Sequence, residues 1–243
     1  MFETGQPFGA LVLANLVTFL AAFVQTATGL GFAMVAVPLL AIIHLDFVPG
    51  PTLFASVFLA TSMLVGGRSA IVGTETVAML PALAVGTVVG AIVLAVAPTQ
   101  ALGPLFALAI LAAVAVTVLV RPFDLTPLSL RYGGFAAGLM GTVSGIHGPP
   151  LAVLYQKESV EKTRATMALV FLIGYVISLI ALAAAGHFDL RRGALGLQLL
   201  PGLFLGFAAA RKARGLLPVG VVRASMLAVA SISAIILLAK SWA

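Results

Sequence analysis

The sequence predicts an all-α polytopic membrane protein made of two inverted repeats, each a broken or re-entrant helical hairpin followed by three transmembrane helices. Three observations support this fold class. First, 62% of the 243 residues are hydrophobic, and only 13 basic and 7 acidic residues occur, whereas about a quarter of a soluble domain is charged. Second, several uncharged runs approach about twenty residues, the length that crosses a bilayer. Third, two of these runs are interrupted by central glycines.

The same composition excludes several classes of protein. The chain has too few polar side chains to be a soluble enzyme, a nucleic-acid-binding module or a disordered chain. The absence of cysteine excludes disulfides, thiolate metal sites and cysteine nucleophiles. Met1-Phe2-Glu3 lacks the positive region of a cleavable signal peptide, so we expect the first apolar segment to be retained.

The first repeat is expected over residues 1–121 and begins with the broken segment 8–44. This segment holds 37 residues without Lys, Arg, Asp or Glu, and as one straight helix it would be about 55 Å long. At its centre lies Thr28-Gly29-Leu30-Gly31-Phe32, where we expect the helix to break and the chain to turn back. The repeat is completed by three spans, near 51–66, 76–97 and 101–120.

The second repeat is expected over residues 122–243 and begins with the broken segment 132–156. Its centre reads Ser144-Gly145-Ile146-His147-Gly148-Pro149-Pro150. Because this segment is short enough to cross once, its re-entry rests on its equivalence to the first broken segment. The repeat is completed by three spans, near 165–185, 194–210 and 219–239.

Matching residues in the same order indicate the duplication. Thr28-Gly29 matches Ser144-Gly145 at an offset of 116, and Val57-Phe58-Leu59 recurs as Val170-Phe171-Leu172 at an offset of 113. At an offset of 120, Leu80-Pro81, Leu83, Gly86 and Pro98 recur as Leu200-Pro201, Leu203, Gly206 and Pro218. Small loop insertions account for the changing offset. Gly86 and Gly90 form a small-xxx-small pair, which predicts close helix packing.

The basic residues favour inverted repeats. If all eight segments crossed fully, six basic residues would lie on one side and seven on the other, against the tendency of basic residues to lie in the cytoplasm. If the two broken segments turn back, ten lie on one side and three on the other. The ten are Arg68, Arg121, Arg131, Lys157, Lys162, Arg164, Arg211, Lys212, Arg214 and Arg223, and the three are Arg191, Arg192 and Lys240. Both termini are then expected on the extracytoplasmic side.

The two breaks predict an anion site near the bilayer midplane. A helix restarts after each break, near Gly31-Phe32 and at Pro149-Pro150. Free N–H groups and the positive dipole end of a helix N-terminus suit an anion, and paired breaks in inverted repeats indicate the substrate site of a transporter. The predicted substrate-binding residues are Gln25, Thr28, Gly29, Leu30, Gly31, Phe32, Ser144, Gly145, Ile146, His147 and Gly148.

Among these residues, His147 is the only ionisable one at the centre of either break. It could donate a hydrogen bond to an oxyanion or couple transport to a proton, or it could be a neutral histidine bonded to a loop carbonyl.

A different class of protein is an intramembrane hydrolase that uses Ser144 with His147 or His187. The Gly-x-Ser-Gly motif of such a protease is absent, because Thr142 takes the place of its glycine, and no His-Glu-x-x-His motif occurs. We therefore expect no enzyme, no cofactor and no metal.

The motifs of the two breaks give the chain a family resemblance. Thr28-Gly29-Leu30-Gly31-Phe32 with Pro38, the second motif Ser144 to Pro150, and Leu200-Pro201-Gly202 through Gly206 to Arg214 resemble the sulfite exporter TauE/SafE family, also called the 4-toluene sulfonate uptake permease family. The resemblance covers nearly the whole chain. It implies movement of small sulfur-containing anions, such as sulfite or short organosulfonates, across the bacterial cytoplasmic membrane. The second motif departs from a plain glycine-rich pattern at His147.

The sequence thus predicts a secondary transporter or facilitator of small sulfur-containing anions. No Asp or Glu lies deep in an expected span, so a carboxylate proton relay is absent. Export from a negative-inside cell gains about 2.3 kcal/mol per charge per 100 mV and needs no coupling ion. The alternatives are an anion channel, or an uptake permease coupled to H⁺ or Na⁺. The expected partners are the anion and the lipid bilayer, and no nucleic acid is expected to bind. The exact anion, the coupling ion and the presence of a homodimer stay open.

Overall fold

The computed structural model describes residues 6–65, 73–121, 124–212 and 219–242, and these ranges contain helices and no strands. Within these ranges, six helical stretches are long and apolar enough to cross a membrane, if Leu45–Val65 and Leu190–Lys212 are each counted as one. The two broken segments are helix pairs, and the other segments follow them along the chain. The helices are α1 (Phe8–Thr28), α2 (Phe32–Ile43), α3 (Gly50–Val65), α4 (Gly73–Val96), α5 (Leu102–Leu119), α6 (Pro127–Ser144), α7 (Gly148–Leu154), α8 (Val160–Ala184), α9 (Leu190–Gln198), α10 (Leu200–Lys212) and α11 (Val219–Trp242), with short 3-10 turns at Leu45–Phe47 and Thr99–Ala101.

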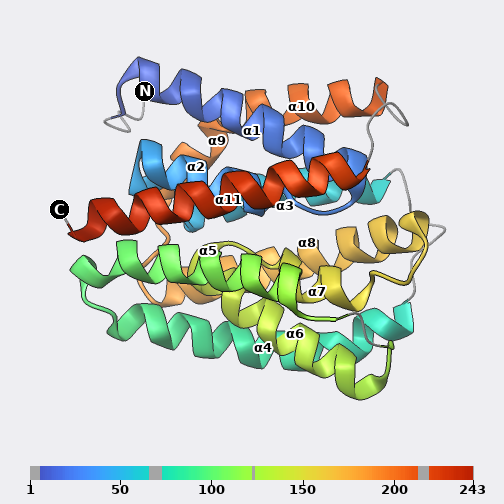
Figure 1. Cartoon of the computed structure of the whole chain (residues 1–243). Coiled ribbons are helices and arrows are strands. Elements are labelled where there is room, and N and C mark those ends of the chain that lie inside the picture. Colours follow the sequence, from blue (N-terminus) through green and yellow to red (C-terminus); the bar gives the residue numbers. More distant parts are fainter. Residues whose placement is uncertain (1–5, 66–72, 122–123, 213–218, 243) are drawn as a thin grey trace.

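The helices pack in pairs that join the first half of the chain to the second. α1 packs on α10 at one edge of the molecule, and α4 packs on α6 at the opposite edge (Figure 1). Between these edges, α3 packs on α8 and α5 on α11, while α2 contacts α11 and α7 contacts α5. The two halves can be matched in chain order: α1 with α6, α2 with α7, α3 with α8, α4 with α9–α10, and α5 with α11. Under this matching, the pair α1–α10 corresponds to α4–α6, and α2–α11 corresponds to α5–α7. The pairs α3–α8 and α5–α11 correspond to themselves.

Glycines allow the closest of these contacts. A Cβ atom added to Gly86 would meet the carbonyl oxygen of Phe135, and one added to Gly206 would meet that of Phe19. Phe19 and Phe135 are 116 residues apart and Gly86 and Gly206 are 120 apart, which are the offsets of the sequence repeat. Gly90 also faces α6, so the predicted packing role of the Gly86 and Gly90 pair is confirmed.

One predicted span contains a short interruption. Within the span expected near 194–210, Leu199 separates α9 from α10. Pro201 has no N–H for the helical ladder. The side chain of Asn15 on α1 then donates to the Gln198 carbonyl oxygen over 2.9 Å and accepts from the Gly202 N–H over 2.8 Å. A neighbouring helix thus satisfies the interrupted backbone, and the stretch Leu190–Lys212 as a whole is long and apolar enough to cross a membrane.

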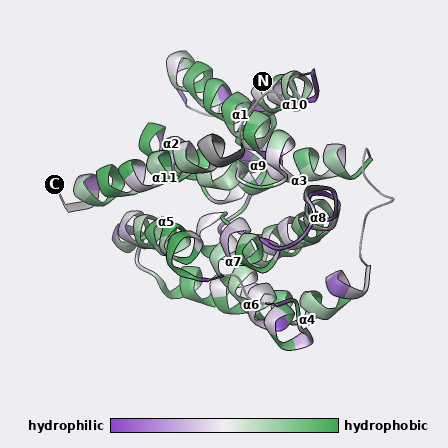
Figure 2. Ribbon diagram, turned by 45° about the vertical axis from the view of Figure 1, so that its right-hand side comes forward, coloured by the Kyte–Doolittle hydropathy of each residue, from purple (hydrophilic) through white to green (hydrophobic). Residues whose placement is uncertain are grey.

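The outward faces of the helices are apolar, as expected for a protein surrounded by lipid. On α1, Leu13, Leu16 and Leu20 are each more than half exposed, and much of the helical ribbon in Figure 2 has the colour of hydrophobic residues. α1 begins and α11 ends at the same end of the molecule (Figure 1). Arg68 and Arg214, which were counted in the charge argument, lie outside the described residues, and so does the side chain of Arg223.

Ion pairs tie the two halves together at the helix ends. Lys162, at the start of α8, lies 2.7 Å from Glu75 on α4 and 2.9 Å from Glu158. The Tyr155 hydroxyl donates to Glu75 over 2.7 Å. In the matching place, between the 3-10 turn that precedes α3 and the start of α9, Arg191 lies 3.2 Å from Asp46. Polar side chains therefore connect the two halves of the chain at the ends of these helices.

Candidate functional site: two helix breaks around Tyr175

The first break is a left-handed turn at the end of α1. Gly29 has a φ of 91° and donates its N–H to the Gln25 carbonyl oxygen over 2.7 Å. The Thr28 hydroxyl lies 2.9 Å from the Val24 carbonyl oxygen and 2.6 Å from that of Leu30, and it accepts from the Leu30 N–H. Because positive φ favours glycine, Gly29 allows the chain to leave the helix at this residue.

The second break repeats this turn at the end of α6. Gly145 has a φ of 84° and donates to the Gly141 carbonyl oxygen over 2.8 Å. The Ser144 hydroxyl donates to the Met140 carbonyl oxygen over 2.8 Å and lies 3.4 Å from the Ile146 nitrogen. Thr28 and Ser144 thus have the same local role, since each hydroxyl holds its own turn. The prediction that both helices break at these motifs is confirmed.

A side chain covers the N-terminus of α2. The Phe32 N–H donates to the Gln25 side-chain oxygen over 3.0 Å. Gln25 is 1% exposed and comes from α1, seven residues earlier. A buried amide without a partner would cost about 1–3 kcal/mol, so Gln25 satisfies a donor that the break itself creates.

In the second break, the His147 ring fills the corresponding space. A Cβ atom on Gly141 would overlap this ring. Gly141 stands 116 residues after Gln25, and His147 stands 116 after Gly31. Each break therefore combines one glycine with one large polar side chain. In the first break the polar residue, Gln25, is on the helix and the glycine, Gly31, is in the loop. In the second break the glycine, Gly141, is on the helix and the polar residue, His147, is in the loop. The Nε2 atom of His147 lies 3.2 Å from the Ser178 hydroxyl, and the imidazole is also hydrogen-bonded to the backbone of Gly145, within its own loop.

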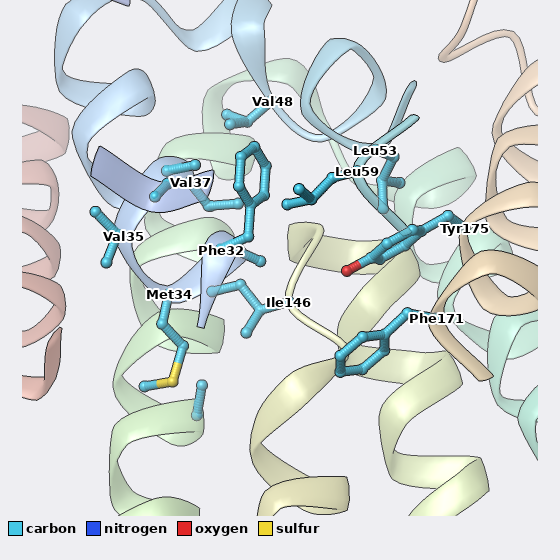
Figure 3. Packing of buried hydrophobic residues seen from close by; sticks show 14 of the residues in the cluster. Phe32, Met34, Val35, Val37, Val48, Leu53, Leu59, Ile146, Phe171 and Tyr175 are labelled. Carbon is cyan, nitrogen blue, oxygen red and sulfur yellow. The ribbon is translucent and has the colours of Figure 1, made fainter. Parts of the chain in front are cut away.

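Tyr175 on α8 connects the two breaks. Its ring packs edge-on against His147 with 5.0 Å between the ring centroids, and its side chain is hydrogen-bonded to Gln25 and Ser56. Figure 3 shows the hydroxyl of Tyr175 directed from α8 toward the side on which Phe32 and Ile146 lie. Tyr175 is 2% exposed. A buried tyrosine usually keeps a polar partner, and here the partners come from the first half of the chain.

The two tips pass each other and do not meet end to end. A Cβ on Gly29 would lie 3.2 Å from the Cα of Arg164, near the start of α8. A Cβ on Gly145 would lie 3.2 Å from Val37, well inside α2, and 3.8 Å from Pro49, just before α3. Each tip thus lies near the start of a helix of the other half. The first break contributes Gln25, and the second break His147, to the surroundings of Tyr175.

The predicted site residues divide into three groups. Gln25 and His147 contact Tyr175, and Gln25 also binds the Phe32 amide. Figure 3 shows Phe171 beside Tyr175, and Phe32 and Ile146 on the side to which its hydroxyl points. The groups that hold the turns or pack the tips are Thr28, Gly29, Leu30, Gly31, Ser144 and Gly145. Gly148 begins α7, where Pro149 and Pro150 supply no N–H groups, so the second break offers fewer backbone donors than predicted.

Sequence reasoning missed Tyr175, Ser178 and Arg164. The guanidinium of Arg164 donates to the Ala27 carbonyl oxygen over 2.6 Å, at the C-terminal end of α1, where a positive charge is favourable. The only sequence signal for Tyr175 is its distance from Phe171, four residues and one helical turn earlier. Nothing in α8 alone shows that this face meets both breaks.

Comparison with known families agrees with this architecture. The family model described as sulfite exporter TauE/SafE matches residues 14–237, which include both breaks and nearly the whole chain. No curated protein and no solved structure matches the chain. The family is one of membrane transporters, in keeping with the six apolar helices and with a Ser144 hydroxyl bonded to Met140 instead of to His147. The chain therefore belongs to the TauE/SafE family of sulfite exporters.

Proposed function

We propose that this protein carries small sulfur-containing anions, sulfite or short organosulfonates, out of the cell across the bacterial cytoplasmic membrane. The observation that carries the proposal is the family match over residues 14–237. The geometry supports an anion as the substrate, because the N-terminus of α2 is buried and its first amide is held by a side chain from outside its own helix. A helix N-terminus and its amides favour negative charge.

The proposed anion site lies around Tyr175. The Phe32 amide, the Tyr175 hydroxyl and the His147 imidazole are hydrogen-bonding groups at this place. Phe171 stacks on Tyr175 with 5.7 Å between centroids, so one wall is apolar and suits the carbon chain of a short organosulfonate. Strong hydrogen bonds to an oxyanion in a dry interior are worth more than the same bonds in water.

Inverted repeats would let the two halves exchange roles during transport. Three observations support this arrangement: the packed pairs map onto one another, the closest glycine contacts recur at offsets of 116 and 120, and the basic residues segregate when the broken segments return. A rocking motion of the two halves around a central site is how such repeats work in other carriers. Both termini lie outside the cytoplasm in this proposal.

Export is the direction that the membrane potential favours. An anion that leaves a negative-inside cell gains about 2.3 kcal/mol per charge per 100 mV. Uptake would need a coupling ion, and His147 is the proposed residue for proton coupling because it is an ionisable group inside the second break that packs against Tyr175. His147→Gln would abolish a pH dependence of transport while it keeps a hydrogen-bonding group near Ser178.

The test is sulfite flux from proteoliposomes that contain the purified protein. We expect release to exceed that from protein-free liposomes, to saturate with sulfite, and to increase when the compartment holding sulfite is made negative. Stimulation by sulfite on the opposite side would indicate a carrier, and flux that neither saturates nor responds to it would indicate a channel. Release equal to that of protein-free liposomes at both polarities would contradict the proposal.

A further inference from the structure

The described helices pack into two groups, and matching the repeats in chain order turns each group into the other. One group, which we call the α3 group, contains α1, α2, α3, α9, α10 and α11, and the other, the α8 group, contains α4 to α8. In both Figure 1 and Figure 2 the α3 group lies above the α8 group. The groups meet where α3 packs on α8 and α5 packs on α11. This boundary is therefore the place for a relative movement of two rigid bodies.

The tips of both broken segments cross this boundary. The first tip belongs to the α3 group, and a Cβ on Gly29 would lie 3.2 Å from the Cα of Arg164, near the start of α8. The second tip belongs to the α8 group, and a Cβ on Gly145 would lie 3.2 Å from Val37 and 3.8 Å from Pro49, just before α3. Each tip thus docks near the start of the central helix of the other group.

The two docking places lie toward opposite ends of the molecule. Near the start of α8, Lys162 pairs with Glu75 at the start of α4. The start of α3 lies at the far end of α8, because a Cβ on Gly50 would meet the ring of Phe188, just after α8 ends. Tyr175 lies between these ends, about three turns along α8 from the first tip. Each tip therefore covers the boundary on one side of Tyr175.

The two docking contacts differ in chemistry. The guanidinium of Arg164 donates to the Ala27 carbonyl oxygen over 2.6 Å, so a charged side chain of the α8 group holds the last turn of α1. In the described part of the chain α1 does not pack along α8, which makes this bond a point contact between the groups. The second tip rests on a methyl group of Val37 and on the ring of Pro49. A charge-assisted hydrogen bond is directional and strong, whereas an apolar contact is non-directional.

We propose that Arg164 is a latch: its bond to Ala27 keeps the first tip docked, closes the route to Tyr175 from the end at which α8 starts, and breaks during the transport cycle. The inference rests on the proposed function and adds a residue that sets how often the site is open to that side, which faces the cytoplasm in the proposed topology. Arg164 is thus a positioning residue, because it acts on the tip and not on the anion.

The surroundings of the bond allow it to break and form again. Arg164 and Ala27 are both partly exposed. When the tip moves away, water can therefore solvate the guanidinium and the carbonyl oxygen, and opening leaves no buried charge behind. The net strength of such a bond is modest, because bonds to water replace it. A bond of this kind shifts the balance between a docked and an undocked tip without locking the protein in one state.

The experiment uses the absence of cysteine from the chain. Leu59→Cys places a single thiol in the buried cluster of Figure 3, at a side chain that is 0% exposed and one turn after Ser56, a hydrogen-bond partner of Tyr175. Its rate of reaction with a membrane-impermeant maleimide is measured in right-side-out and in inside-out membrane vesicles. In a separate variant, Lys157→Cys, the exposed thiol marks the vesicles in which the start of α8 faces the reagent.

We expect Arg164→Met to raise the labelling rate of the Leu59→Cys thiol about tenfold in the vesicles that expose the start of α8, and to leave it unchanged in the others. Arg164→Gln is polar but too short to keep the bond, and it should act in the same way, so one folded variant is sufficient. An unchanged rate would show that the bond does not hold the tip. A rise in both kinds of vesicle, or only from the opposite side, would show a general loosening or a different route. Each of these results overturns the proposal.

Lys157→Met is the matched control. Lys157 is also a basic residue near the start of α8, and its amino group lies 2.7 Å from Asp124. This pair lies within the α8 group, between the segments that flank α6 and α7. Its loss should therefore leave the labelling rate of the Leu59→Cys thiol unchanged in both kinds of vesicle, and a rise equal to that in Arg164→Met would overturn the latch.

Sulfite flux distinguishes the latch from a role in anion binding. Loss of a latch increases the fraction of the protein that is open to the anion, so the KM for sulfite presented at the start of α8 should fall about three- to tenfold in Arg164→Met. A KM that rises would show that Arg164 is a ligand of the anion and would overturn the proposal. The labelling rates need no transported anion, so they decide on the latch even if the wild type shows no sulfite flux, the result that contradicts the proposed function.

Discussion

The first and second breaks have the same backbone conformation but differ in the side chain that fills the inside of the turn. Both helices end at a left-handed glycine whose N–H bonds four residues back, and both turns are held by a hydroxyl of Thr28 or Ser144. Inside the turn, the first break uses Gln25 from the preceding helix, whereas the second uses His147 from the loop itself. The duplicated turn thus constrains the backbone, while the chemistry of its interior is free to diverge.

This divergence also changes what each break can offer a ligand. The first break has the amides of a helix of 12 residues, whereas α7 has 7 residues and begins with Gly148-Pro149-Pro150. The second break offers an imidazole instead, paired with Ser178, which is itself 2.9 Å from Thr142. One break is therefore suited to donate backbone N–H groups and the other to position a side chain.

The largest expected effect comes from adding one methyl group to the second break. In an exposed helix interior, Gly→Ala stabilises by about 1 kcal/mol. In Gly141→Ala the new Cβ overlaps the buried His147 ring, so we expect a loss of about 3 kcal/mol, because overpacking forces the ring and its neighbours to move. The free energy of unfolding in mixed micelles with SDS, compared with the wild type, measures this loss.

The control is the double variant Gly141→Ala with His147→Ala. Removing the ring makes room for the methyl group, so this variant should be more stable than Gly141→Ala alone, which is a non-additive result for residues in contact. If both variants lose the same stability, or if Gly141→Ala is as stable as the wild type, the interior of the second break is not filled by His147 as described.

The sequence predicted the breaks well, because their signals are local. Gly29 and Gly145 are needed for positive φ, and the surrounding runs are too long or too glycine-rich for one straight helix. That Gly86 packs closely on another helix followed from its spacing to Gly90, whereas the identity of that helix, α6, did not. These features depend on a few neighbouring residues, and a single sequence contains that information.

The site was predicted less completely, because its assembly depends on contacts between distant helices. Tyr175 is one of many large residues on an apolar helix, and only the packing of α8 against both halves distinguishes it. The overlap of the tips has the same origin: Gly145 rests on Val37, a contact across more than a hundred residues. Gln25 was included as a site residue for its position one turn before Thr28, but its bond to Phe32 requires the folded turn.

Substitutions at the tips of the two breaks are expected to change stability by an intermediate amount. Gly29→Ala and Gly145→Ala both force a non-glycine residue into the left-handed region, at a cost of about 1–2 kcal/mol each. In Gly29→Ala the new Cβ also presses on the backbone Cα of Arg164 at 3.2 Å, whereas in Gly145→Ala it meets a methyl group of Val37 at the same distance. We expect Gly29→Ala to lose about 2 kcal/mol of stability and Gly145→Ala about 1 kcal/mol.

The comparison uses the same SDS titration, together with sulfite flux. Both substitutions should lower flux through displacement of the tip and not through obstruction of the anion site, because the added atoms point at Arg164 and at Val37. A KM that stays close to the wild-type value while the maximal rate falls is therefore expected. A KM that rises tenfold in either variant would place the glycine against the anion.

The smallest effect is expected from the hydroxyl groups that hold the two turns. Thr28→Val keeps the shape of the side chain but removes an oxygen that lies close to two carbonyl oxygens and accepts from Leu30, so about 1 kcal/mol of stability should be lost. Ser144→Ala removes one short bond to Met140 and a contact of 3.4 Å to the Ile146 nitrogen, and we expect about half that loss. Equal losses in the two variants would mean that the breaks are equally rigid. A larger loss for Ser144→Ala would reverse the comparison, because the second turn would then depend more than the first on its hydroxyl group.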